Sequence, residues 1–188
     1  GRDCVERLRA GGVDVSGLQV STEPTGLTVV LSDGEERSAF TLVGAIDAPS
    51  PGWDTPADVP AARHLHVASF YLQPRRAAAL PRILEVARAA GLTTSLDTNL
   101  DPSGAFEGLD EVLPLLDWLL PNRAEILGIA ASLTGATHKD THDDLADAAA
   151  VVARRGVTVV VKDGDRGALL VHPDGTSLRE AGRPITPV

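Results

Sequence analysis

Several features that mark other protein classes are missing from this chain of 188 residues. It has a single cysteine, Cys4, so an internal disulfide and a zinc cluster built on cysteines are both excluded. No apolar run approaches the roughly 18 residues needed to cross a membrane. The net charge of −9 argues against binding to a nucleic-acid backbone, which needs clustered lysine and arginine. No signal peptide is recognisable, which makes a cytoplasmic location the default expectation.

The chain also contains no methionine, and it starts at Gly1 and stops at Val188, directly after a segment that leads toward a strand. We therefore expect an internal piece of a longer protein. Hydrophobic residues make up 43% of the chain and charged residues 23%, as in folded globular proteins. The length is sufficient for one domain with a sizeable core and a small appendage.

A β-hairpin pattern dominates the first quarter of the chain. β-type runs at residues 27–31 and 38–43 flank Asp33-Gly34, and Asp-Gly between two such runs is a strong hairpin signal. Before the hairpin, residues 2–10 predict a helix and residues 13–20 an extended strand. A hairpin buries little by itself, so we expect this segment to cover another part of the protein.

Strands alternate with helices along the rest of the chain. The expected strands are residues 64–70, 93–96, 117–120 and 157–161, and burial is expected for residues 64–70 and 118–120. The expected helices are residues 74–90, 109–116, 122 onward and 141–155, and a second hairpin is expected at 168–179. This alternation predicts βαβ units and an α/β fold with a mostly parallel sheet and helices on both faces.

Three polar segments follow the carboxyl ends of three expected strands, at residues 97–101, 122–125 and 162–167. In an open α/β sheet these segments open onto one edge, where ligands bind. Asn122 and Glu125 have the spacing of a helix capping pair. A helix N-terminus also attracts anions and the metals bound to them. The pair alone fits both interpretations, and its place at the shared edge favours a ligand site.

Residues 162–167 read Lys-Asp-Gly-Asp-Arg-Gly, which combines a lysine with two glycines, as a loop for an anion or a nucleotide would. An ordinary tight turn between two strands explains the same residues. The spacing matches neither G-x-x-x-x-G-K-[ST] nor G-x-G-x-x-G. The absence of the second motif disfavours a dinucleotide-dependent oxidoreductase.

Two pairs of histidines have spacings that need an interpretation. His138 and His142 straddle the helix cap expected at Thr141, so a solvated capping region is favoured over a metal site. His64 and His66 lie on the same side of one expected strand, and we interpret them as one polar face at the end of that strand.

The order of the segments resembles the middle of a PfkB-type (ribokinase-like) sugar kinase. The resemblance spans essentially the whole chain and rests on "GVDVSGL", "PTGLTVVLSDGEERS", "HLHVASFYLQP", "SLDTNLDPSG", "DWLLPNRAEI" and "VVVKDGDRGALLV". It implies a three-layer α/β/α sandwich with a small β-hairpin lid over the sugar. It also implies transfer of the γ-phosphoryl group of ATP to a sugar hydroxyl, with Mg²⁺.

The same resemblance implies a division of the chain. Residues 12–47 would form the lid with a flanking strand, and residues 1–11 and 48–188 would form a partial kinase core. In many relatives the lid packs against a second subunit, which leaves a homodimer through the lid possible.

Residue roles follow from the resemblance, motif by motif. Asn122 and Glu125 match the family's N-x-x-E pair, which lies near the phosphates and tunes Mg²⁺ through bound water. Lys162, Gly164 and Gly167 match the loop along the nucleotide.

Four further residues are candidates for contacts with the sugar. Asp97 and Asn99 follow the carboxyl end of a strand, and Arg37 lies in the expected lid. Tyr71 could line the sugar pocket, although simple burial explains it equally well.

The chain departs from the family pattern in ways that affect function. The family's catalytic base is the Asp of a G-A-G-D motif, which does not occur in this sequence, so no catalytic residue is assigned. Because a general base must reach the hydroxyl that it deprotonates, we expect no sugar phosphorylation by this chain alone. The alternative is a non-catalytic, degenerate nucleotide- or sugar-binding module. Asp101 replaces an Arg that meets acidic sugars in several relatives, and Phe106 stands where Trp is common.

Overall fold

The computed structural model describes residues 2–18, 20–33, 36–48, 55–136 and 142–183. The chain divides into two compact units, Gly1–Pro49 and Ser50–Val188, which are treated separately below. Gly34, Trp53, His138 and Thr141 lie outside the described residues, and so do the side chains of Arg37 and His142.

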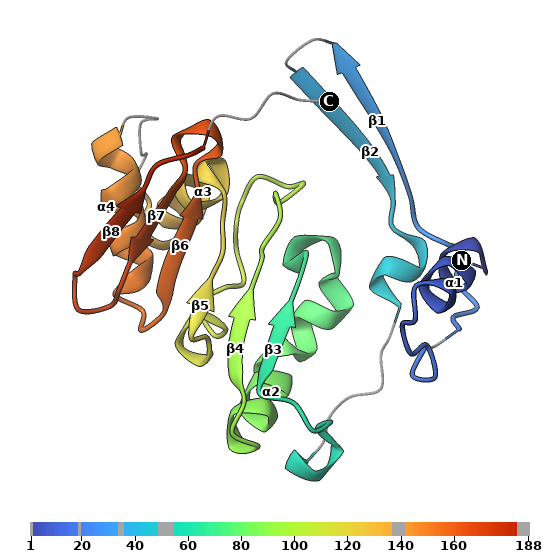
Figure 1. Cartoon of the computed structure of the whole chain (residues 1–188). Coiled ribbons are helices and arrows are strands. Elements are labelled where there is room, and N and C mark those ends of the chain that lie inside the picture. Colours follow the sequence, from blue (N-terminus) through green and yellow to red (C-terminus); the bar gives the residue numbers. More distant parts are fainter. Residues whose placement is uncertain (1, 19, 34–35, 49–54, 137–141, 184–188) are drawn as a thin grey trace. The chain divides into compact units, whose positions relative to one another are not determined.

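The first unit contains one helix and one hairpin. Helix α1 spans Arg2–Ala10, and strands β1 (Leu27–Asp33) and β2 (Glu36–Leu42) pair antiparallel (Figure 1). The predicted hairpin is thereby confirmed. Its register places one face of the hairpin at Leu27, Val29, Leu31, Phe40 and Leu42. All five residues are at least half exposed.

The strand expected at residues 13–20 is wrong, because the described part of this segment contains turns. The Asp14 carboxylate accepts hydrogen bonds from the backbone N–H of Ser16, at 2.8 Å, and from its hydroxyl, at 3.0 Å. A short polar side chain that bonds the backbone two residues on favours a turn over a strand.

The second unit is built on a six-stranded sheet in the order β3-β4-β5-β6-β7-β8 (Figure 1). The first four strands are parallel: β3 (His64–Val67), β4 (Thr93–Leu96), β5 (Trp118–Leu119) and β6 (Thr158–Lys162). The last two, β7 (Ala168–Val171) and β8 (Ser177–Glu180), add antiparallel as a hairpin. The predicted α/β fold with a mostly parallel sheet is confirmed.

The described part of this unit contains three α-helices. They are α2 (Pro74–Ala89), α3 (Arg123–Thr134) and α4 (His142–Ala153). Helices α3 and α4 pack against each other and against β6. The buried core includes Leu84, Leu96, Leu119, Ile126, Ile129, Leu145, Val152, Val159 and Val161. No helix among the described residues is sufficiently long and apolar to span a bilayer.

Two elements are shorter than the sequence predicted. Strand β3 ends at Val67, and Phe70–Leu72 forms a 3₁₀ turn instead of continuing it. Strand β3 is also not buried: it lies at the edge of the described sheet, and both of its histidines are exposed. Strand β5, the other strand expected to be buried, is buried at Leu119 but 40% exposed at Trp118. The helix expected at residues 109–116 is reduced to a 3₁₀ turn, Leu113–Leu115, because Pro114 lacks the N–H that a longer helix would use.

Candidate functional site

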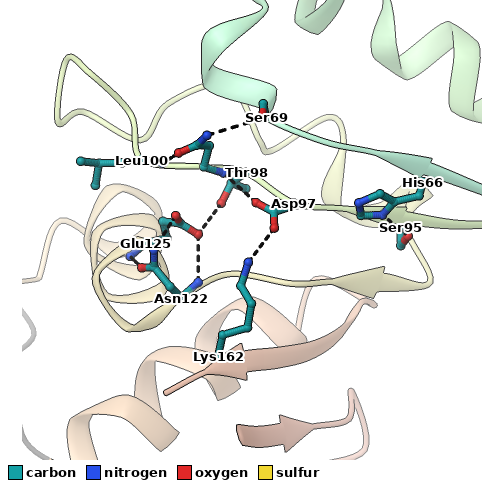
Figure 2. A network of polar contacts seen from close by, with 10 residues as sticks. His66, Ser69, Ser95, Asp97, Thr98, Leu100, Asn122, Glu125 and Lys162 are labelled. Atoms are coloured by element: carbon teal, nitrogen blue, oxygen red, sulfur yellow. Dashed lines mark hydrogen bonds and ion pairs between the residues drawn. The ribbon is translucent and has the colours of Figure 1, made fainter. Parts of the chain in front are cut away.

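The three polar segments at the carboxyl ends of β4, β5 and β6 lie together, as predicted. Lys162, at the end of β6, places its Nζ 2.6 Å from Oδ2 of Asp97, which follows β4 (Figure 2). Thr98 donates from its hydroxyl to Oε2 of Glu125 in α3, at 3.2 Å. Side chains from three strand ends are therefore joined in one polar network.

Asn122 and Glu125 form a reciprocal cap at the start of α3. The backbone N–H of Glu125 donates to Oδ1 of Asn122 at 2.9 Å, and the backbone N–H of Asn122 donates to Oε2 of Glu125 at 2.9 Å. The amide Nδ2 of Asn122 also donates to Oε1 of Glu125, at 2.7 Å. Both carboxylate oxygens of this buried Glu are thus hydrogen-bonded within the protein. A nearby cation would reach this carboxylate most readily through water.

Thr98 is a member of this network that the sequence reasoning missed. It is completely buried, and its hydroxyl links the end of β4 to the cap of α3. A signal was available, because Thr98 lies between the two polar candidates Asp97 and Asn99.

Asp97 and Asn99 shape the chain after β4. Oδ1 of Asp97 accepts from the backbone N–H of Asn99 at 3.1 Å, and Asn99 adopts the left-handed conformation, with φ of 59°. Nδ2 of Asn99 donates to the hydroxyl of Ser69, after β3, at 3.4 Å. These contacts give both residues a structural role at the ligand edge, and their contact with a sugar stays a prediction.

Tyr71 lies beside this network. Its backbone N–H donates to the carbonyl of Thr98 at 3.2 Å, and its ring meets Phe70 and Phe106 edge-on. Among the described residues its buried hydroxyl has no hydrogen-bond partner. Burial, followed by the negative charges of Asp101 and Glu125, raises the pKa of Tyr71 far above its ordinary value. The phenol is therefore neutral at any physiological pH.

Within residues 162–167, which connect β6 to β7, Gly164–Arg166 forms a 3₁₀ turn. Gly164 and Gly167 have φ of 60° and 91°, a region that favours glycine. A Cβ on Gly167 would also collide with the carbonyl oxygen of Glu180, and one on Gly182 would collide with that of Asp165. The glycines at 167 and 182 thus allow two backbone segments to approach closely, which supports the tight-turn interpretation for Gly167.

Asp163 is a second residue that the sequence reasoning missed. Its carboxylate is buried and accepts from Arg123 Nε at 2.7 Å, from a second Arg123 nitrogen at 3.2 Å and from Arg179 at 3.2 Å. Arg166 lies 3.4 Å away. The hydrogen bond from Arg123 holds the pKa of Asp163 below its ordinary range, against the opposing effect of burial. Arg123 and Arg179 lie 40 and 16 residues from Asp163 in the sequence, so no local pattern could reveal these two partners.

Asp101 organises the loop after β4 instead of projecting a free carboxylate. It accepts from the backbone N–H groups of Ser103, at 2.9 Å, and Phe106, at 2.7 Å. Burial by itself would raise the pKa of Asp101, but hydrogen bonds from Ser103, Phe106 and Ala105 together lower it. Asp101 also borders an open pocket of about 610 Å³, between the start of α2 and this loop.

His64 and His66 form a polar face on β3, as predicted. His64 Nε2 and His66 Nδ1 each lie 2.7 Å from the hydroxyl of Ser95 on β4. Among the described residues no group of three or more His, Cys, Asp or Glu side chains is arranged to hold a metal ion.

Comparison with known proteins decides the family. The model of the pfkB family carbohydrate kinases matches residues 1–188. The chain belongs to this family. It is 26% identical to the bifunctional ribokinase/ribose-5-phosphate isomerase A of Fructilactobacillus sanfranciscensis, over 93% of this chain and 31% of that protein. This pfkB-family chain thus spans less than a third of its curated relative.

Solved structures agree on the fold of this pfkB-family chain. Adenosine kinase from Anopheles gambiae superposes with a TM-score of 0.77 at 22% identity, over 99% of this chain and 57% of that one. Ribokinase from Cryptococcus neoformans, in complex with ADP, gives 0.75 at 23% identity, over 98% and 60%. Ribokinase from Thermotoga maritima gives 0.69 at 21%, over 98% and 57%. The predicted ribokinase-like fold is confirmed.

Proposed function

We propose that this chain is the nucleotide-handling part of a sugar kinase, which transfers the γ-phosphoryl group of ATP to a sugar hydroxyl. One observation carries the proposal: Glu125 at the capped start of α3 is bonded to Thr98 after β4, and Asp97, the neighbour of Thr98, is bonded to Lys162 at the end of β6. The membership of the chain in the pfkB family supports this chemistry. So do related structures that hold ADP, in the Cryptococcus ribokinase, and ribose with ATP, in the Arabidopsis thaliana ribokinase.

The charges at this edge suit phosphoryl transfer, which depends on positioning and on neutralising the negative charge of the phosphates. The N-terminus of α3 presents backbone N–H groups and the positive end of its dipole. Lys162 has a half-exposed side chain that reaches the same edge. In our proposal Asn122, Lys162, Gly164 and Gly167 border the nucleotide.

The carboxylates at the edge fit a Mg²⁺ ion that keeps most of its water. Mg²⁺ is bound through one or two carboxylates and the substrate phosphates more often than by an all-protein cage. Asp97 is partly exposed, while the oxygens of Glu125 already accept hydrogen bonds from Asn122 and Thr98. We assign Glu125 to contact with the ion through water. When bound, the ion would neutralise charge that develops on the phosphates.

The sugar in this proposal lies near Asp97, Asn99 and Tyr71, and Arg37, within the lid at residues 12–47, is a further candidate contact. Asp101 stands at a place where an acidic sugar would need a cation, so the acceptor is a neutral sugar. Residues 1–11 and 48–188 are assigned to the kinase core, and the lid is assigned to homodimer contacts. The cytoplasmic location also belongs to this proposal.

Binding of ADP with and without Mg²⁺, measured by calorimetry on this chain, tests the site. We expect Mg²⁺ to strengthen ADP binding in the parent chain, and Glu125→Gln to abolish that gain. Glu107→Gln, a change at the open pocket, is the matched control and should bind like the parent chain. Absence of ADP binding by the folded parent chain would reject the proposed site.

Catalysis needs a separate test, because the G-A-G-D motif does not occur in this sequence. We propose that this chain alone does not phosphorylate sugars, and that the reading frame extended at both ends does. ATP consumption against a panel of sugars, by both polypeptides, distinguishes the outcomes. Turnover by these 188 residues alone would refute the first statement. An extended frame that binds nucleotide or sugar without turnover would favour the non-catalytic binding module.

A further inference from the structure

Three guanidinium groups surround the buried carboxylate of Asp163. Arg123 makes a two-point contact, at 2.7 and 3.2 Å, and its side chain is 13% exposed. Arg179 approaches at 3.2 Å and Arg166 at 3.4 Å. The Asp163 side chain itself is only 1% exposed. One negative charge thus faces three positive charges, and the exposed fraction of the arginine side chains rises from 13% for Arg123 through 27% for Arg179 to 55% for Arg166.

This cluster connects the two halves of the proposed nucleotide site. Arg123 is the first residue of α3 and directly follows the cap residue Asn122. Asp163 directly follows Lys162 and opens the turn that contains Gly164 and Gly167. The backbone supports the same connection, because the N–H of Lys162 donates to the carbonyl of Pro121 at 2.8 Å.

The number of arginines exceeds what a structural ion pair requires. One bidentate arginine neutralises the charge of a carboxylate, and a further cation that is partly buried, as Arg179 is, must overcome its own desolvation. Arg179 shows this desolvation cost, because one of its terminal nitrogens is buried without a hydrogen-bond partner among the described residues. Local violations of this kind are expected where a function requires them.

We propose that Asp163 and Arg123 form a clamp that positions the start of α3 against the 162–167 turn, and that the surplus arginines make this junction attractive to polyphosphate. The inference rests on the proposed function, because it assigns positioning residues to the same nucleotide site. The clamp acts through its neighbours: Arg123 fixes the cap of α3, and Asp163 fixes the turn that follows Lys162.

Removing the carboxylate should be more damaging to the site than to the fold. Asp163→Asn removes the negative charge that Arg123, Arg166 and Arg179 share, and the repulsion between these arginines drives the turn away from α3. Arg123→Gln removes the main link while Arg179 still holds Asp163. Arg123→Lys keeps the charge but loses the two-point contact, so it should retain part of the affinity.

The experiment measures the Kd of Mg²⁺–ADP and the melting temperature of each variant of this chain. Binding is measured well below the melting temperature, so that only folded protein contributes. We expect Asp163→Asn and Arg123→Gln each to weaken binding on the order of tenfold or more. The double variant should bind Mg²⁺–ADP no more weakly than the single variant with the higher Kd, because the two residues act as a unit. The matched control is the exposed ion pair Arg155–Asp110, at 2.8 Å, whose removal by Arg155→Gln should change neither quantity.

Amide hydrogen exchange gives a readout that does not need nucleotide. In Asp163→Asn, exchange should accelerate both in the turn after Asp163 and at the amide of Glu125 in the first turn of α3. Acceleration confined to the 162–167 turn, or a lower melting temperature with unchanged Kd, would overturn the clamp and leave a purely structural ion pair. If the parent chain binds no ADP, the proposed function fails, while the exchange data still decide whether the clamp exists.

Discussion

At the scale of single residues, the polar groups of the candidate site serve the fold before they serve a ligand. Glu125 completes the cap that Asn122 begins at the start of α3, Asp97 bonds to the backbone of the turn after β4, and Asp163 pairs with arginines. The sequence left open whether Asn122 and Glu125 were a cap or a ligand site, and the structure shows that the cap exists. The ligand role is compatible with it, because a cap places a carboxylate at a helix N-terminus.

The hydroxyl of Tyr71 gives a prediction at this scale. It is buried without a partner among the described residues, and an unsatisfied buried polar group costs about 1–3 kcal/mol. Tyr71→Phe should therefore raise the free energy of unfolding by up to about 1 kcal/mol, as measured by urea denaturation. Thr98→Val is the control, because that hydroxyl is bonded to Glu125 and its loss should destabilise the protein. Destabilisation by Tyr71→Phe would reveal a partner for the hydroxyl.

The depressed pKa of Asp163 predicts how stability depends on pH. An unfolded Asp has a pKa near about 3.9, so its stabilising contribution is fully present above that value. As the pH falls through the lower pKa of the folded state, Asp163 is protonated and the contribution is lost. Urea denaturation between pH 3 and pH 7 should show a steeper acid-side loss for the parent chain than for Asp163→Asn. Equal slopes would contradict the assignment.

At the scale of elements, α3 is the helix that organises the site. It starts at its cap beside the ligand edge, and further along, Gly128 faces the ring of Phe106, which comes from the loop after β4. Phe106 itself has a φ of 52°, an unusual value for an aromatic residue. The contact ties α3 to the loop that carries Asp101, and the Arg123–Asp163 ion pair ties α3 to the 162–167 turn.

Gly128→Ala tests this contact. Ala is about 1 kcal/mol better than Gly in a helix interior, so an isolated helix would gain stability. Here the added Cβ would collide with the Phe106 ring, and overpacking costs about 1–3 kcal/mol. We expect a net loss in the free energy of unfolding by urea denaturation. Ser132→Ala, at an exposed position of the same helix, is the control and should be neutral or slightly stabilising. A stabilised Gly128→Ala variant would show that the ring yields easily.

At the scale of the whole molecule, the buried core belongs to the second unit. Every buried hydrophobic residue among the described ones lies between Phe70 and Val171, whereas the hairpin of the first unit exposes one apolar face. A two-stranded hairpin with no core of its own is marginal in water. Exposed apolar faces of this kind mark interaction surfaces, which agrees with the proposed role of the lid in dimerisation.

Expression of separate pieces tests this division. Residues 55–188 alone should unfold in one cooperative urea transition with native-like circular dichroism, because the piece keeps the entire core. Residues 1–49 alone should show no cooperative transition. The full chain, measured in parallel, is the reference. A piece of residues 55–188 without cooperative unfolding would mean that the core depends on the first unit.

Local chemistry explains which parts the sequence predicted well. The hairpin at Asp33-Gly34, the start of α3 after Asn122 and the strand at β6 each depend on residues a few positions apart. Failures occurred where the competing signal was also short: Asp14 formed a turn in place of a strand, and Pro114 shortened a helix. The exposure of β3 could not be predicted, because it depends on the place of that strand in the sheet.

The sequence by itself determined the α/β class, the edge of the sheet at which polar residues gather and the cap of α3, since strand direction and capping follow from local order. Only the tertiary structure decided that Thr98 bonds to Glu125, and that Arg123 and Arg179 meet at Asp163. Those contacts join residues 16 to 40 positions apart. Their existence depends on which strands become neighbours and how closely the backbones approach, and no short stretch of sequence carries that information.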